Sequence, residues 1–180
     1  MTGQVQLFKN KLGECKKLET SDCLHKTSFE ITNLPIFYIF ENREGNSPVK
    51  MVTGKPYQLT VINKKNQDIC LIKTDRCLFT DENQKCDCIL FNKTTLFFVE
   101  ISESKGKKRR GKRADAYLQI EATYNSLKNN LIDLSKFQLN GRICFMHEGM
   151  AVTRASENAK KAYFNDILKI YVTEGNGIDF

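Results

Sequence analysis

Short apolar runs separated by polar turns dominate the middle of the chain and predict a series of β-strands. The polar turns between these runs are short, and residues 76–79, RCLF, are expected to form a short extension before one of them, so we expect consecutive strands to be antiparallel neighbours. An apolar and aromatic run at 36–40 precedes the series, and the N-terminal region before it has weak helical character. The predicted strands of the series are residues 57–62, 68–73, 86–91 and 96–102.

The period of the pattern changes after Ala114. Apolar residues then recur at three- and four-residue steps, which predicts a helix from Ala114 to about Leu134. A strand is expected in the apolar run after Gly141, and a second amphipathic helix over 156–172. Strands followed by a helix, a strand and a helix predict an α/β fold with a mixed β-sheet flanked by helices. The apolar stripe of the first helix consists of Tyr117, Ile120, Tyr124, Leu127 and Leu131.

The length of 180 residues fits a single domain, residues 1–180. Within it we expect a core at about 57–150, an N-terminal extension over 1–56 and the C-terminal helix 156–172. The sequence contains no apolar run of the roughly 20 residues that cross a membrane, and its first residues lack the apolar core of a secretion signal. We therefore expect a cytoplasmic protein without a membrane partner. The odd number of cysteines, seven, favours reduced thiols in that compartment.

The positive charge of the chain is concentrated in one segment. The formal net charge is +7, and residues 105–113 alone carry seven Lys and Arg side chains without an acid. A local cationic block favours a polyanionic partner more than a generally basic surface does. The side chains predicted to contact nucleic-acid phosphates are Lys107, Lys108, Arg109, Arg110, Lys112 and Arg113.

Two acids interrupt the apolar strands just before this cationic block. Both faces of the last strand in the series are apolar up to Glu100, so this strand is expected to be central, where a lone carboxylate is costly to desolvate. Asp87, in the preceding strand, is the candidate partner. A hairpin loop of 92–93 makes the two acids diagonal neighbours on one face, and a loop of 92–95 places them directly opposite. An odd loop centred on Lys93 would place them on opposite faces.

Two carboxylates on one sheet face form an oxygen-rich site that suits Mg²⁺ or Mn²⁺. Beside a cationic block, such a site suits cleavage of a phosphodiester, because the metal polarises the phosphoryl group and activates a bound water. The cationic block would hold the nucleic-acid backbone. Asp87 and Glu100 are therefore the candidate metal ligands of a nuclease.

The segments KCDCILF, LFFVEIS and YLQIEAT, in this order, resemble the PD-(D/E)xK nuclease superfamily over roughly 69–143, and most resemble small bacterial members associated with phage defence. The resemblance implies a restriction-endonuclease-like core and Mg²⁺-dependent hydrolysis of nucleic acid, with DNA as the expected substrate. It also implies a homodimer or a subunit of a larger defence complex. Asp87 matches the first acid of the family pattern and Glu100 the second. Gln119 matches a glutamine that related proteins often carry on the following helix, facing the site.

The chain departs from the family pattern at one position. The family has a lysine two residues after the second acid, where it helps to position the attacking water, and this chain has Ser102. Lys105 or Lys107 could reach back to this position, because a lysine side chain is long and flexible, and Lys105 is the candidate replacement with a catalytic role. The alternative is an inactive protein that keeps the fold and serves as a nucleic-acid-binding or scaffolding subunit of a defence complex. A third hypothesis is a domain whose cationic loop binds an acidic protein partner.

Each candidate residue also has a structural interpretation. Asp87 could pair with Lys85 or Arg76, and Glu100 could face water at the end of its strand. Gln119 could be an exposed helix residue, and the cationic block a solvated loop. The Tyr and Phe residues fall mostly on core periodicities, so we do not expect a base-stacking platform.

Overall fold

The computed structural model of this chain has an α/β fold in which two mixed β-sheets are flanked by helices. The larger sheet consists, in spatial order, of β1 (Phe29–Thr32), β5 (Ile69–Lys73), β6 (Cys88–Phe91), β7 (Thr95–Ser102), β8 (Gln138–Phe145) and β9 (Ile170–Glu174). The smaller sheet consists of β10 (Gly177–Asp179), β4 (Leu59–Ile62), β2 (Ile36–Phe40) and β3 (Lys50–Val52). The structure describes residues 2–14, 27–41, 48–79, 84–104, 108–145 and 155–180.

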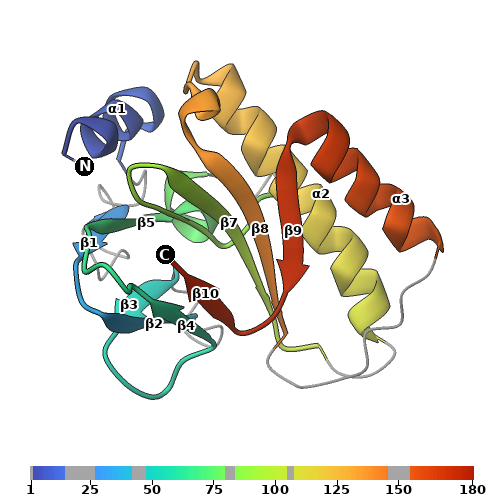
Figure 1. The fold of residues 1–180 in the computed structure, drawn as a ribbon, viewed down its shortest axis with the longest axis horizontal. Helices are drawn as coiled ribbons and strands as arrows, with labels where there is room; N and C mark the ends of the chain where they lie inside the picture. The colour runs from blue at the N-terminus through green and yellow to red at the C-terminus, as the bar shows by residue number, and fades with distance from the viewer. Residues whose placement is uncertain (1, 15–26, 42–47, 80–83, 105–107, 146–154) are drawn as a thin grey trace.

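Antiparallel and parallel pairing divide the larger sheet into two parts. Strands β1, β5, β6 and β7 are antiparallel neighbours; the turn between β6 and β7 is short, whereas the connection between β5 and β6 contains the segment Thr74–Leu78. Strands β7, β8 and β9 run parallel, and a helix connects each parallel pair. These helices are α2 (Lys108–Asn129) and α3 (Ala155–Tyr163), and α1 (Thr2–Leu12) lies before the first strand. Figure 1 shows α2 and α3 on one side of the larger sheet and the smaller sheet on the opposite side.

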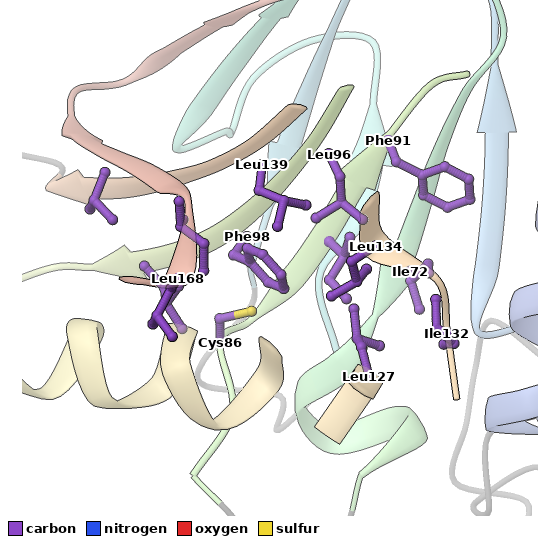
Figure 2. Close-up of a cluster of buried hydrophobic side chains, with 14 of the residues drawn as sticks. Ile72, Cys86, Phe91, Leu96, Phe98, Leu127, Ile132, Leu134, Leu139 and Leu168 are labelled. Atoms are coloured by element: carbon purple, nitrogen blue, oxygen red, sulfur yellow. The ribbon is translucent and has the colours of Figure 1, made fainter. Parts of the chain in front are cut away.

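The first hydrophobic core lies between the larger sheet and the helices. Leu96 and Phe98 of β7 contribute to it, together with Ile120 and Leu127 of α2. Figure 2 shows Leu96 and Phe98 on the sheet side of this cluster, facing Leu127 and Leu134. Each such fully buried side chain stabilises the fold by about 1.5–3 kcal/mol relative to an exposed one.

The second hydrophobic core lies between the two sheets. Phe97, Val99 and Ile101 of β7 contribute to it, and Leu59 and Val61 of β4 face them from the smaller sheet. Successive residues of β7 therefore face opposite cores, which explains why the strand has no polar face before its end. The prediction that this strand is central and covered on both sides is confirmed.

Several sequence-based expectations differ from the structure. Strand β4 pairs with β2 and β10 in the smaller sheet, so it is not a neighbour of β5 in one meander, although both strands line the second core. The region expected as an extension, 1–56, contributes β1 to the larger sheet and two strands to the smaller one. Helix α2 begins at Lys108, earlier than predicted, because Lys and Arg are themselves good helix formers.

The predicted helix over 156–172 is wrong in its last part. The helical segment ends with a π-helical turn, Phe164–Leu168, and Lys169 takes a left-handed conformation with φ of 58°. Ile170 and Val172 then continue as β9, where both face the first core. Periodicity predicts a helical stripe here because Ile167 and Ile170 are three residues apart, although Ile170 and Val172 alternate as strand residues do.

A buried ion pair within the larger sheet is also linked to the smaller sheet by a hydrogen bond. The Lys73 side chain is fully buried at the end of β5, and its Nζ lies 2.5 Å from Glu30 Oε1 on β1. The second carboxylate oxygen of Glu30 accepts a hydrogen bond from Met51 N on β3, at 2.9 Å. Glu30 therefore bridges three strands of the two sheets.

Among the described residues, no helix combines the length and the apolar character needed to cross a membrane.

Candidate functional site

The hairpin of β6 and β7 places the two candidate acids opposite each other. Cys88 pairs with Val99 and Phe91 with Leu96, so the same register places residue 87 opposite residue 100. This is the arrangement predicted for a loop of 92–95, and the odd-loop alternative is excluded. Both side chains are buried, with 5% of Asp87 and 8% of Glu100 exposed.

Hydrogen bonds to two neighbouring segments fix the position of Asp87 at the start of β6. Its carboxylate oxygen Oδ2 accepts a hydrogen bond from Ile101 N at 2.6 Å, next to Glu100 on β7. Its backbone oxygen accepts from Thr74 N and Asp75 N, both at 3.3 Å, in the turn Thr74–Leu78 that follows β5. The carboxylate therefore continues the β6–β7 ladder by one hydrogen bond, in the place of a backbone carbonyl.

Glu100 lies in the interior of the sheet. It alternates with Val99 and Ile101, which face the second core, so its register assigns it to the helix side of the sheet together with Phe98. With 8% of the residue exposed, the interpretation of Glu100 as a strand-end carboxylate that faces water is wrong. A buried carboxylate at such a position needs compensating cations or hydrogen-bond donors.

The charges of both acids act on the pKa of the Cys86 thiol, so both acids lie near this side chain. The pKa of Cys86 is raised to about 12, chiefly by burial; the charges of Glu100 and Asp87 act in the same direction, and hydrogen bonds with Thr123 and Thr74 act against it. Burial also raises the pKa of Cys88 well above its ordinary value, and Asp87, Glu100 and Glu41 act in the same direction. Glu41, a buried acid that the sequence analysis did not single out, directly follows β2.

Helix α2 is attached to the segment that leads into β6. Gln119 Nε2 donates a hydrogen bond to the backbone oxygen of Lys85 at 3.1 Å. Thr123 Oγ1 accepts from Cys86 N at 2.9 Å and donates to the backbone oxygen of Gln119 at 2.8 Å. Gln119 is therefore partly buried and held beside the strand that starts at Asp87. Thr123 was missed by the sequence analysis, although its spacing of four residues from Gln119 places both on one helix face.

The position of the family lysine is occupied by a buried hydroxyl. Ser102 is 5% exposed, and its Oγ accepts a hydrogen bond from Ser104 N at 3.3 Å. Lys105, the candidate replacement, and Lys107 lie outside the described residues. Of the cations considered as partners of Asp87, Lys85 has its Nζ 4.9 Å from the centre of the Phe79 ring. The other, Arg76, lies 3.5 Å from Asp75 through its Nε atom.

The described part of the cationic block forms the first turns of α2. Arg113 is 7% exposed and binds the Glu174 carboxylate of β9 through both Nε and Nη2. The guanidinium of Arg109 lies 4.3 Å from the centre of the Phe145 ring and 3.9 Å from Glu174 Oε2. These two side chains attach the helix to the sheet. The remaining cations of this helical segment, Lys108, Arg110 and Lys112, are exposed.

The donor chemistry of the acidic pair fits a hard divalent cation. Among the described residues, no group of three or more His, Cys, Asp or Glu side chains is arranged to hold a metal ion. Mg²⁺ in proteins is often bound through one or two carboxylates, with waters and substrate phosphates completing its coordination. Asp87 and Glu100 supply carboxylates of this type, so the residues present fit Mg²⁺ or Mn²⁺.

Comparison of the chain with protein-family models, with curated proteins and with solved structures gives no match. The assignment of a function therefore depends on the geometry of the site and on the physical properties of its residues.

We expect the Cys86 thiol to be unreactive in the folded protein. A pKa near 12 leaves only about a thousandth of the thiol ionised at pH 9, whereas an ordinary cysteine is about half ionised there. Alkylation by iodoacetamide at pH 9, followed by peptide mass spectrometry, should therefore be at least several hundredfold slower for Cys86 than in the protein unfolded in urea. Equal rates in the two states would contradict the buried position of this thiol.

Proposed function

We propose that this protein is a metal-dependent nuclease that hydrolyses phosphodiester bonds, with DNA as the substrate. The observation that carries this proposal is the pairing register of β6 and β7, which places two buried carboxylates, Asp87 and Glu100, opposite each other. Two carboxylates that lie close together repel each other, and a bound divalent cation relieves this repulsion. A function in which Asp87 and Glu100 bind a divalent cation therefore fits this arrangement.

The topology around the pair gives further support. An antiparallel series of three strands, β5, β6 and β7, is followed by α2 and then by β8 parallel to β7. This is the order of strands and helix on which the resemblance to the PD-(D/E)xK nucleases was based. It places the two acids on adjacent strands and Gln119 on the helix that follows them, as the resemblance implies.

Each candidate residue would have a distinct role in hydrolysis. Asp87 and Glu100 would hold Mg²⁺ or Mn²⁺, which supplies Lewis-acid activation of a water and of the phosphoryl group when it is bound. Gln119, fixed through Lys85, would orient the substrate or the water by hydrogen bonding. The exposed cations Lys108, Arg110 and Lys112 would contact the phosphate backbone without reading its sequence.

Cleavage assays test this proposal. Supercoiled plasmid, linear duplex, single-stranded DNA and RNA are each incubated with the protein in Mg²⁺, in Mn²⁺ and in EDTA. We expect cleavage with either metal and none in EDTA, with DNA cleaved in preference to RNA. The absence of metal-dependent cleavage of every substrate would remove the nuclease proposal.

The alternative function is a nucleic-acid-binding or scaffolding subunit of a defence complex that has lost the chemistry. Ser102 favours it, because a buried hydroxyl engaged with Ser104 cannot supply the positive charge of the family lysine. This alternative predicts binding without cleavage. Binding through the exposed cations should weaken steeply with salt, and replacing Lys108, Arg110 and Lys112 with Ser should reduce that salt dependence.

A further inference from the structure

The smaller sheet has an outer face that is opposite to the second core. Ile39, Leu59, Val61 and Ile178 point inwards, so their neighbours along β2, β4 and β10 point outwards. The pairing register arranges these outward residues in cross-strand rows. One row consists of Val52, Tyr38, Thr60 and Gly177, a second of Ile36, Ile62 and Asp179, and a third of Lys50 and Phe40.

No described part of the chain covers this outer face at Ile36 or at Gly177. Ile36 has 50% of its surface exposed, although it is an apolar residue of a strand. A Cβ atom added to Gly177 would meet no atom within 4 Å, so the sheet surface beside Thr60 is open. In Figure 1 the helices lie on the far side of the larger sheet from β2, β4 and β10.

Aromatic rings and lysines occur together on this face. The rings of Tyr38 and Tyr57 are stacked, with centroids 4.1 Å apart and an angle of 20° between their planes. Beside them, Lys50 Nζ lies 5.7 Å from the centre of the Phe40 ring. Thr60 and Gly177, the next residues of the Tyr38 row, are small, so they leave room beside the tyrosine ring.

The charges at this face are mainly positive. Lys50 belongs to it, Lys55 is exposed in the segment between β3 and β4, and Lys64 follows β4. The acidic residue in these cross-strand rows is Asp179, and Lys64 Nζ lies 2.8 Å from its carboxylate. An open sheet with stacked aromatic rings and a surplus of lysines matches the requirements of single-stranded nucleic acid, whose exposed bases stack on rings and whose phosphates attract cations.

We propose that the outer face of the smaller sheet binds single-stranded nucleic acid, with bases stacked on Tyr38, Tyr57 and Phe40 and phosphates near Lys50 and Lys55. The bases of a duplex are already stacked on one another, so a duplex should bind this face more weakly. The sequence analysis did not expect such a platform. In the run IFYIF both alternating sets of positions are apolar or aromatic, so the pattern does not distinguish the buried face from the open one.

This inference does not depend on the nuclease proposal. Asp87 and Glu100 belong to the larger sheet, and Glu100 is on its helix side, whereas the platform faces away from the second core. A nuclease could use the platform to hold a strand, and an inactive subunit could use it for binding alone. The test therefore measures binding and does not use cleavage as its readout.

The experiment is fluorescence anisotropy of a labelled 15-nucleotide oligo(dT) in EDTA, with a labelled duplex of the same length for comparison. We expect the single strand to bind more tightly than the duplex. Tyr38→Ala and Tyr57→Ala should each weaken single-strand binding about tenfold or more, since loss of one stacked base is worth roughly 5- to 150-fold. Tyr38→Phe should retain binding, and Lys50→Gln should reduce the salt slope by about one.

The matched control is Tyr171→Ala, because Tyr171 is 63% exposed on β9, in the other sheet, and should not affect binding. Tyr57 precedes β4, so its substitution tests the platform even if Tyr38→Ala destabilises β2. Unchanged single-strand affinity in well-folded Tyr57→Ala would overturn the inference, and so would equal losses for single strand and duplex. Sedimentation showing a dimer that Tyr38→Ala dissociates, without oligonucleotide binding, would instead assign this face to a second copy of the chain.

Discussion

Glu100→Gln and Asp87→Asn are each expected to reduce metal-dependent cleavage by about a thousandfold under the nuclease proposal, because each removes a charged ligand whose contribution is several kcal/mol. Both substitutions keep the size of the side chain, and the Asn amide oxygen can still accept the hydrogen bond from Ile101 N that Asp87 Oδ2 accepts at 2.6 Å. The measurement is the initial rate of plasmid cleavage in Mg²⁺ and in Mn²⁺, with circular dichroism to verify folding.

The matched control for Glu100→Gln is Glu103→Gln, which removes the same charge from an exposed acid just after β7. Glu103→Gln should cleave at nearly the rate of the unchanged protein. If the Glu100 and Asp87 variants are as active as this control, then the cleavage comes from another site or from a contaminating enzyme. In that case the pairing register of β6 and β7 would have a purely structural meaning.

Glu30→Ala is expected to lower the free energy of unfolding by about 3–5 kcal/mol, because it leaves the buried ammonium of Lys73 without its carboxylate. The same substitution removes the acceptor for Met51 N, so the link between β1 and β3 is lost as well. Urea unfolding followed by circular dichroism measures the effect, since the chain has no tryptophan to report by fluorescence.

Two further variants distinguish this cause from a general loss of charge. Asp115→Ala breaks an exposed pair, in which Lys112 and Asp115 side chains are 57% and 51% exposed, and should change stability by less than about 1 kcal/mol. Lys73→Met combined with Glu30→Ala removes both buried charges and should recover part of the lost stability. A double variant less stable than Glu30→Ala alone would show that Lys73 contributes through other contacts.

Local periodicity predicted much of the larger sheet. The strands β5, β6 and β7 follow from short apolar runs separated by polar segments, the antiparallel pairing of β6 and β7 follows from their short turn, and α2 follows from its apolar stripe. The second sheet could not be predicted in this way. Strand β4 looks like one more member of the meander, and only its pairing with β10 and β2, which come from distant parts of the sequence, assigns it to a separate sheet.

Within the candidate site, the sequence predicted the opposition of Asp87 and Glu100 for a loop of 92–95, and β6 and β7 have this register. It did not predict that the Asp87 carboxylate would accept a hydrogen bond from Ile101 N, because such a bond depends on how the side chain is oriented toward the neighbouring strand. The structural roles of Arg109 and Arg113 were also missed. Their partner, Glu174, lies far along the chain on β9, and periodicity predicts a helix for the first part of this strand.

The way the smaller sheet is assembled has a consequence for folding kinetics. Strand β4 pairs on one side with β2, which lies shortly before it, and on the other with β10, so that Thr60 pairs with Gly177. Bringing such distant segments together requires closing a very long loop, and this entropic cost is paid before the pairing contributes anything. Refolding should therefore be slow for a protein of this size, with a late step in which β10 joins β4 in the smaller sheet.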